Sequence, residues 1–141
     1  MPETNVPSQL FPCAKRRILI VDDEKGIREV FMAIVTCGLP DCRVDLAING
    51  AEAVESFRAI HHQIIVMDLN MPVMNGLDAF VEIQAICREE KWAMPAVIFC
   101  TGFDPPNALN SALQSGAGHL LLRKPVTNDT LIHAISERLN G

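Results

Sequence analysis

The chain has 141 residues, of which 49% are hydrophobic and 21% are charged, and its formal net charge is −5. This length and composition predict one soluble globular domain and exclude a disordered chain. The acidic balance argues against direct nucleic-acid binding, because such a surface needs clustered Lys and Arg on one face. The one basic run, at residues 15–17, is predicted to be a solvated strand entrance.

The cysteines and the hydropathy pattern indicate the compartment. Cys37 and Cys42 are too far apart for a paired zinc site, and no second pair follows them. Cys100 lies in an apolar run and is expected to be a buried small hydrophobe. No apolar stretch approaches the ~20 residues that cross a bilayer, and residues 1–14 lack a signal-peptide pattern. We therefore expect a cytoplasmic protein in a reducing compartment, without membrane contact.

Residues 1–14 differ in composition from the rest of the chain. They carry Pro2, Pro7 and Pro12 and show no apolar periodicity. This pattern predicts a flexible N-terminal arm, followed by one folded domain over residues 15–141.

After this arm, short apolar runs alternate with amphipathic stretches. Residues 18–21 are continuously apolar, as expected for a strand buried on both faces. Asn49 followed by Glu52 is typical of a capping box that opens a helix, and Gly116 is expected to cap the fourth helix. The predicted strands are 18–21, 43–48 (nearer a sheet edge), 64–67, 96–100 and 120–122, and each precedes a helix, near 27–38, 51–61, 77–89, 106–115 and 128–139.

Five strand–helix units in succession predict an α/β fold, with a mainly parallel sheet and helices on both faces. In such sheets, ligands bind beyond the carboxyl ends of the strands. Residues that directly follow a strand are therefore candidates for chemistry. They are Asp22, Asp23, Asp68, Thr101 and Lys124.

Three of these candidates are acids, and like charges gathered at one edge repel one another. A hard divalent cation with oxygen ligands relieves this repulsion, and Mg²⁺ is held by few carboxylates and several waters. Taken alone, Asp22 and Asp23 fit turn and N-cap roles equally well. Lys124 alone is an ordinary surface lysine, and Thr101 alone is an ordinary strand-end residue.

The combination is more specific than its parts. An acid pair, a single acid, a hydroxyl and a lysine follow strands one, three, four and five. Together they supply a carboxylate nucleophile, a metal site and two groups for phosphoryl oxygens. This set predicts phosphoryl transfer onto a carboxylate, a reaction that depends on positioning and charge neutralisation.

Four segments carry a family resemblance: residues 18–24, Asp68–Gly76, Thr101-Gly102 and Lys124-Pro125. Over about residues 16–140 the chain resembles the receiver domain of two-component response regulators. The resemblance implies a flavodoxin-like three-layer α/β/α sandwich with a five-stranded parallel sheet. It also implies a phosphorylation-activated signalling switch whose phosphoryl group comes from a sensor histidine kinase or a histidine phosphotransfer protein, and whose downstream protein target is unknown.

The same resemblance implies a role for each candidate residue. Asp68 is expected to be the phosphoacceptor, Thr101 the switch hydroxyl and Lys124 the phosphoryl-binding lysine. Mg²⁺ is expected to bind Asp68, Asp23 directly, Asp22 mainly through water, and the backbone carbonyl of Asn70. A cis bond is expected between Lys124 and Pro125. The resemblance also implies that this protein is a signalling receiver rather than an enzyme, and that it catalyses only its own phosphorylation and dephosphorylation.

Two departures from the family pattern stand out. Leu121 occupies the place where the family often has Tyr or Phe, and residues 116–120 are one residue longer than usual. We therefore expect coupling through displacement of the weak helix near 106–115 rather than through a swinging ring.

Three other protein classes share some of these features. A haloacid-dehalogenase-type phosphatase needs a second acid two residues after its nucleophile, where this chain has Asn70. A flavodoxin needs a phosphate loop after the first strand, where Asp22 and Asp23 would repel the phosphate. A binding module that has lost phosphorylation is disfavoured because all five site residues are present.

The histidines and the tryptophan are assigned no chemistry. His61 and His62 are adjacent and do not share a helix face, which predicts a solvated helix end. His119 and His133 lack evident partners, and Trp92 is predicted to pack in a loop.

Overall fold

The computed structural model describes residues 16–116 and 118–140, so the predicted arm over residues 1–14 lies outside the described part. In this described part, ten elements alternate strictly between strand and helix. They are β1 (Arg17–Val21), α1 (Lys25–Gly38), β2 (Arg43–Ala47), α2 (Gly50–Ile60), β3 (Ile64–Asp68), α3 (Gly76–Glu90), β4 (Ala96–Thr101), α4 (Ala108–Gln114), β5 (Leu120–Arg123) and α5 (Asn128–Asn140).

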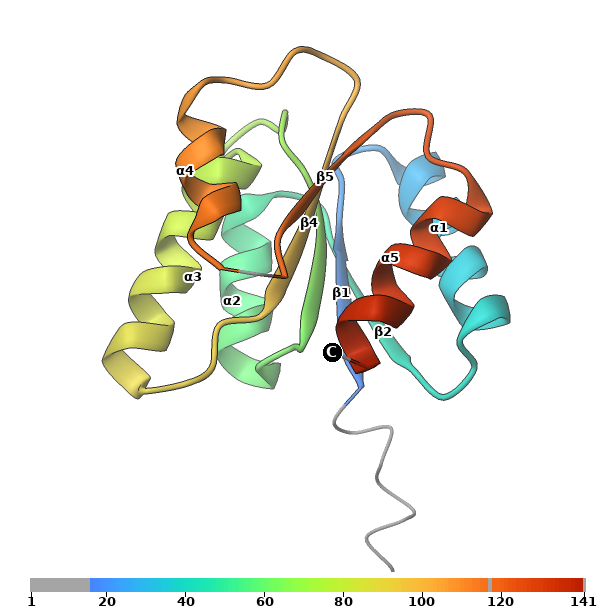
Figure 1. The fold of residues 1–141 in the computed structure, drawn as a ribbon, viewed down its shortest axis with the longest axis horizontal. Coiled ribbons are helices and arrows are strands. Elements are labelled where there is room, and N and C mark those ends of the chain that lie inside the picture. Colours follow the sequence, from blue (N-terminus) through green and yellow to red (C-terminus); the bar gives the residue numbers. More distant parts are fainter. Residues whose placement is uncertain (1–15, 117, 141) are drawn as a thin grey trace, which may run out of the picture.

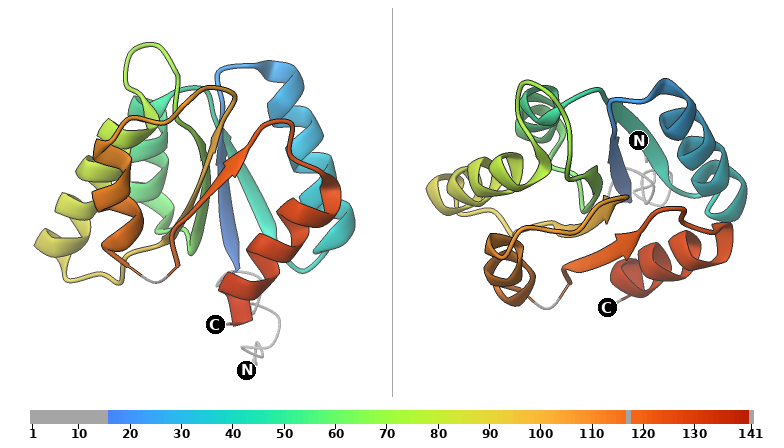
Figure 2. Two further views of the ribbon diagram at one scale, coloured as in Figure 1. Left: turned by 45° about the horizontal axis from the view of Figure 1, so that its top comes forward. Right: turned by 90° about the horizontal axis from the view of Figure 1, so that it is seen from above.

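The five strands form one parallel sheet in the order β2-β1-β3-β4-β5. Helices α2, α3 and α4 cover one face, and α1 and α5 cover the other (Figure 1). The view from above shows the sheet between these two helical layers (Figure 2). The predicted three-layer α/β/α architecture is confirmed, and β2 lies at an edge as expected.

Alternation along the strands divides the apolar core into two clusters. In β1, Leu19 and Val21 face the α2–α3–α4 layer, whereas Ile18 and Ile20 face α1 and α5. Strand β3 is buried along its whole length, as a central parallel strand between two helical layers must be. Each fully buried Leu or Ile side chain stabilises the fold by about 1.5–3 kcal/mol relative to an exposed one. The sheet is therefore a rigid base for the loops that follow its strands.

Side-chain caps define where two helices begin. Asn49 Oδ1 accepts the N–H of Glu52 at 2.8 Å, which confirms the predicted cap of α2. Glu52 Oε1 accepts the N–H of Ile48 at 2.9 Å, one residue earlier than in a standard capping box. Asn75 caps α3 in the same way, by accepting the N–H of Asp78 at 2.8 Å. This second cap starts α3 at the loop that follows Asp68.

Helix α4 is shorter than predicted. It begins at Ala108, after two prolines, and ends at Gln114. The expected glycine cap at Gly116 is wrong, because the described residues contain no glycine with positive φ. Instead, Ser115 closes the helix, since both its N–H and its hydroxyl bond the carbonyl of Ala112. The helix therefore ends in a tight final turn rather than in a left-handed glycine.

The prediction for His62 is also wrong. Its side chain is buried and its Nε2 lies 2.8 Å from Asp45 Oδ2, which also accepts from Arg17 at 2.8 Å. Local sequence at a helix end does not reveal a partner on β2. His61 does lie exposed at the helix end, where its ring stacks on Trp92 with 4.3 Å between centroids, so Trp92 packs in its loop as predicted.

His119 was expected to be without partners, but it bonds β4. Its Nδ1 accepts the backbone N–H of Val97 at 3.1 Å, and its ring meets Phe80 edge to face. Burial, and then the charge of Arg138, lower the pKa of His119. Because Nδ1 accepts a hydrogen bond, the ring is held neutral with its proton on Nε2.

Candidate phosphoacceptor site

Strand register brings the candidate residues to one edge of the sheet. Val21 is paired with Met67, Asp68 with Cys100, and Thr101 with Arg123. The residues at and just after these strand ends therefore meet at the carboxyl edge. The structure brings together all five residues that the strand-end rule selects.

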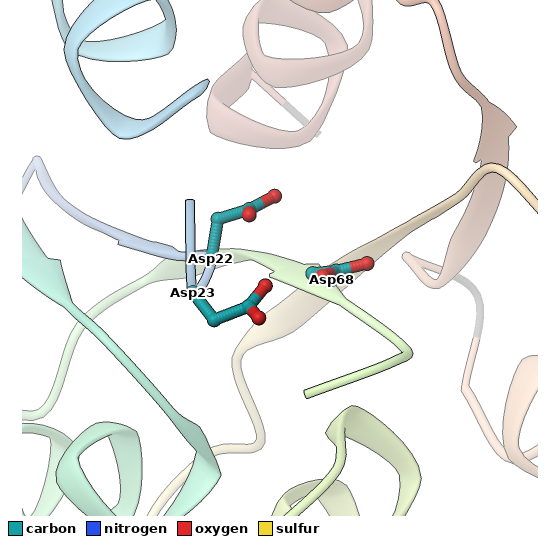
Figure 3. A group of neighbouring side chains, drawn as sticks. All are labelled: Asp22, Asp23 and Asp68. Atoms are coloured by element: carbon teal, nitrogen blue, oxygen red, sulfur yellow. The ribbon is translucent and has the colours of Figure 1, made fainter. Parts of the chain in front are cut away.

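Three carboxylates gather at this edge. Asp22 and Asp23 follow β1 and Asp68 ends β3, so the three side chains come from neighbouring strands (Figure 3). One carboxylate oxygen from each lies within 4.8 Å of the other two. Asp22 and Asp68 are buried, whereas Asp23 is exposed. Carboxylate oxygens in such a group are the ligands of a hard divalent cation.

Lys124 reaches this acid cluster from the end of β5. Its Nζ lies 2.9 Å from Asp22 Oδ2 and 3.4 Å from Asp68 Oδ1. Its backbone N–H bonds the carbonyl of Thr101 at 2.8 Å, and the bond to Pro125 is cis, as the resemblance implied. The positively charged amine of Lys124 thus contacts both buried acids, Asp22 and Asp68.

The charges at this edge do not balance. Burial, and then the charge of Asp22, raise the pKa of Asp68 to about 6, although Lys124 opposes this rise. Burial lowers the pKa of Lys124, but hydrogen bonding to Asp22 and the charges of both acids outweigh it and raise that pKa. Three acids face one lysine, so the donor set fits an additional divalent cation. Mg²⁺ matches these hard oxygen donors.

Asp22 is fixed by its neighbours. Its Oδ1 accepts the N–H of Glu24 at 3.0 Å, and Arg28 donates to its carbonyl at 2.8 Å. The N–H of Asp22 bonds the carbonyl of Ala47 on the neighbouring edge strand at 3.2 Å. The contribution of Arg28 was missed from the sequence, because a bond to a backbone oxygen leaves no residue pattern to read.

The hydroxyl of Thr101 is bonded to the turn that follows β4 and to Asn70. Oγ1 donates to the carbonyl of Phe103 and accepts the N–H of the same residue, both at 3.1 Å. It also accepts from the side-chain amide of Asn70 at 3.2 Å. The backbone N–H of Asn70 in turn lies 3.4 Å from Asp68 Oδ1. The side chain of Asn70 thus has a contact that the sequence reasoning, which considered only its backbone carbonyl, did not anticipate.

The loop after Asp68 is closely packed against the site. A Cβ at position 76 would collide with the carbonyl oxygen of Asp68, which explains a glycine there. The N–H of Gly76 bonds the carbonyl of Leu69, and the N–H of Gly50 bonds that of Met74. Val73 has φ 73° and is 84% exposed, an uncommon conformation for a β-branched residue. Bonds at both ends of the loop hold this conformation.

A protein-family comparison decides the identity. Residues 18–136 match the response regulator receiver domain. The chain belongs to this family. It is a receiver domain of the two-component type, a phosphorylation-activated signalling switch. This match sets aside the dehalogenase and flavodoxin alternatives.

Relatives of similar length support this assignment. The receiver domain is 31% identical over 122 residues to the chemotaxis protein CheY of Thermotoga maritima, covering 86% of this chain and 96% of that protein. It is 32% identical to CheY of Bacillus subtilis, covering 88% and 98% of the two chains. A solved receiver domain from Clostridium thermocellum is 28% identical, has a TM-score of 0.74, and is matched over 94% of its length and 88% of this chain.

Other relatives carry a similar segment within longer proteins. A protein-glutamate methylesterase/protein-glutamine glutaminase of Aliivibrio fischeri is 33% identical over 109 residues, which is 28% of that protein.

No helix in the described part of the receiver domain is long and apolar enough to cross a membrane.

Proposed function

We propose that Asp68 is the residue that accepts the phosphoryl group, from a histidine of a sensor kinase or a phosphotransfer protein. The observation that carries this proposal is the position of the carboxylate: at the end of the central strand β3, with Lys124 at 3.4 Å and two more acids around it. Burial and the neighbouring charge of Asp22 disfavour the ionised form of Asp68. Placing an acid here therefore lowers stability, which favours a functional role over a purely structural one.

In this proposal, an Asp68 carboxylate oxygen attacks phosphorus. The new P–O bond forms as the P–N bond to the donor histidine breaks, and the imidazole leaves with the electron pair. Lys124 then holds a phosphoryl oxygen as a point charge. Mg²⁺, when bound, supplies further neutralisation of the charge on the phosphoryl oxygens. Water later hydrolyses the acyl phosphate, and no other substrate is converted.

The two acids after β1 have different proposed roles in holding Mg²⁺. Both oxygens of Asp22 are engaged, with Lys124 and with the N–H of Glu24. Asp23 is exposed and has no such bond among the contacts of the described residues. We therefore assign Asp23 and Asp68 as direct ligands and Asp22 as a ligand through water, with the carbonyl of Asn70 completing the protein ligands.

Phosphorylation is proposed to be read through the β4–α4–β5 region, where a downstream protein binds. Thr101 ends β4, α4 has only seven residues, and Leu121 packs partly buried against the core. A short helix is a plausible mobile element. We expect amide exchange in residues 102–122 to slow when beryllofluoride occupies the site. Unchanged exchange there, with changes confined to residues 22–76, would point to a different signalling face. The proposal places the protein in the cytoplasm, as the cysteine composition favours.

Labelled acetyl phosphate with Mg²⁺ tests the proposed acceptor. The parent should take up base-labile label, whereas Asp68→Asn should take up none. Asp129→Asn, which changes an exposed acid on α5, should be labelled like the parent. Equal labelling of Asp68→Asn and the parent would refute the assignment, and an unlabelled parent would favour a binding module that has lost phosphorylation.

A further inference from the structure

The Thr101 hydroxyl is fully engaged in this structure. The residue is buried, and Oγ1 makes three hydrogen bonds: to the carbonyl of Phe103, from the N–H of Phe103 and from the amide of Asn70. A hydroxyl has one hydrogen and two lone pairs. These three bonds therefore use its whole capacity, and no hydrogen is left for a phosphoryl oxygen.

Asn70 contacts both the Asp68 carboxylate and the Thr101 hydroxyl. Its backbone N–H lies 3.4 Å from Asp68 Oδ1, and its side-chain Nδ2 lies 3.2 Å from Thr101 Oγ1. The other two bonds of Thr101 go to Phe103, two residues along the same chain. The bond from Asn70 thus ties the Thr101–Phe103 turn to the β3–α3 loop.

We propose that the side-chain amide of Asn70 is a latch that holds Thr101 and Phe103 in the unphosphorylated arrangement. This inference rests on the proposed function of Asp68. Asn70 acts here as a positioning residue: its side chain sets how readily Thr101 turns, and it takes no part in bond making.

The reason is a competition for one hydroxyl. Thr101 can donate to a phosphoryl oxygen on Asp68 only if its hydrogen leaves the carbonyl of Phe103. The latch requires that the same rotation of the side chain breaks the bond that Oγ1 accepts from the Asn70 amide. The charge-assisted bond to the phosphoryl group is stronger than a neutral one, so phosphorylation can overcome the latch. The Asn70 bond raises the free energy that this rotation must supply.

The latch also controls an exposed apolar side chain. Phe103 is 70% exposed, and Thr101 holds both its N–H and its carbonyl. When the hydroxyl turns towards the phosphoryl group, both bonds are lost and the backbone of Phe103 is released. The surface around Phe103 therefore changes with the state of Asp68.

A double-mutant cycle tests the latch. The apparent affinity for beryllofluoride at saturating Mg²⁺ is measured for the parent, Asn70→Ala, Thr101→Val and the double variant. Asn70→Ala should bind beryllofluoride about two- to tenfold more tightly, the range expected for one lost neutral hydrogen bond. In the Thr101→Val background the same change should have no effect. Thr101→Ser keeps a hydroxyl and should preserve the effect.

Two further measurements separate the latch from a general loosening of the loop. Asn107→Ala removes an asparagine of the β4–α4 segment whose side chain makes no cap bond, and it should leave the affinity unchanged. Without beryllofluoride, the amide resonance of Phe103 in Asn70→Ala should move towards its position in the beryllofluoride-bound parent.

The outcomes distinguish this inference from the proposed function. An equal gain from Asn70→Ala with and without the Thr101 hydroxyl, or no gain at all, would overturn the latch while labelling of Asp68 stands. Failure of the parent to be labelled at Asp68, or undiminished binding of beryllofluoride by Asp68→Asn, would overturn the proposed acceptor itself.

Discussion

Two clusters of charged side chains lie on different parts of this sheet, and the pKa of an acid in each shifts in opposite directions. The carboxyl-edge cluster consists of Asp22, Asp23, Asp68 and Lys124. The β1–β2 cluster consists of Arg17, Asp45 and His62, with one base, one acid and one neutral ring. Burial raises the pKa of Asp68 to about 6. Burial also raises that of Asp45, but hydrogen bonds from His62 and Arg17 outweigh it and lower the pKa.

This contrast separates a cluster whose charges are balanced within the protein from one whose charges are not. In the β1–β2 cluster, each charge has its counter-charge within the protein, so the cluster is complete. At the carboxyl edge, acids outnumber the single lysine, so the cluster keeps an excess of negative charge that a bound cation would neutralise. Burial by itself does not mark a functional residue; an unbalanced buried charge does so more specifically.

The largest expected change in the free energy of unfolding comes from removing the acid of the β1–β2 cluster. Asp45→Asn leaves Arg17 and the buried His62 without their shared carboxylate. We expect a loss of about 2 kcal/mol in the free energy of unfolding, less than for a fully buried pair because Asp45 is partly exposed. Urea unfolding at pH 7 measures it. A loss no larger than that of the exposed control Asp129→Asn would contradict the importance of this cluster.

Adding Mg²⁺ should act on the unbalanced cluster alone. A ligand at ten times its dissociation constant stabilises the fold by about 1.4 kcal/mol. We expect the parent and Asp45→Asn to gain this stability, and Asp23→Ala to gain much less. Thermal unfolding with and without the ion measures the gain. Equal gains in the parent and Asp23→Ala would count against direct coordination by Asp23.

Removing one acid at the carboxyl edge should stabilise the metal-free protein. Asp68→Asn removes a buried charge next to Asp22, and we expect a gain of about 1 kcal/mol at pH 7. The pKa of Asp68 is raised from 3.8 to about 6 on folding, so the parent loses stability as the pH rises through this window. The advantage of the variant should therefore grow between about pH 4 and pH 6 and then level off. A variant that is less stable than the parent throughout would contradict the charge imbalance.

The smallest expected effect concerns His62. Burial lowers its pKa below 6.5 despite the bond to Asp45, and its Nδ1 is buried with no hydrogen-bond partner in the described residues. The unfolded chain therefore binds a proton first, and stability falls as the pH drops below 6.5. His62→Gln should reduce this fall in stability by an amount below about 1 kcal/mol, measured by urea unfolding between pH 5 and pH 7. An identical pH dependence in the parent and His62→Gln would exclude a contribution from His62.

Much of the fold could be predicted because the signals are local and repeated. Continuous apolar runs mark buried parallel strands, and the fivefold alternation with amphipathic stretches fixes the layers. The same rule locates the site, since residues after strands such as Asp68 and Lys124 must meet at the carboxyl edge. The structure adds the reason for the glycine at position 76, because the loop there passes against the carbonyl of Asp68.

The features that could not be predicted depend on contacts between segments that are far apart in the sequence. His62 has the sequence surroundings of a solvated helix end, yet it meets Asp45 on β2. The side chain of Asn70 carries no signal in the sequence, because its bond to Thr101 forms only when the loops after β3 and β4 adjoin. Such pairings between loops and edges carry no periodicity, so residue patterns do not reveal them.

The identity of the phosphorylated residue tests the central claim most directly. The receiver domain is phosphorylated with acetyl phosphate and Mg²⁺, the acyl phosphate is reduced with borohydride, and the modified residue is located by peptide mass spectrometry. The account predicts homoserine at position 68 and at no other acid. Homoserine at Asp22 or Asp23, or a phosphate that survives base and resists reduction, would contradict it.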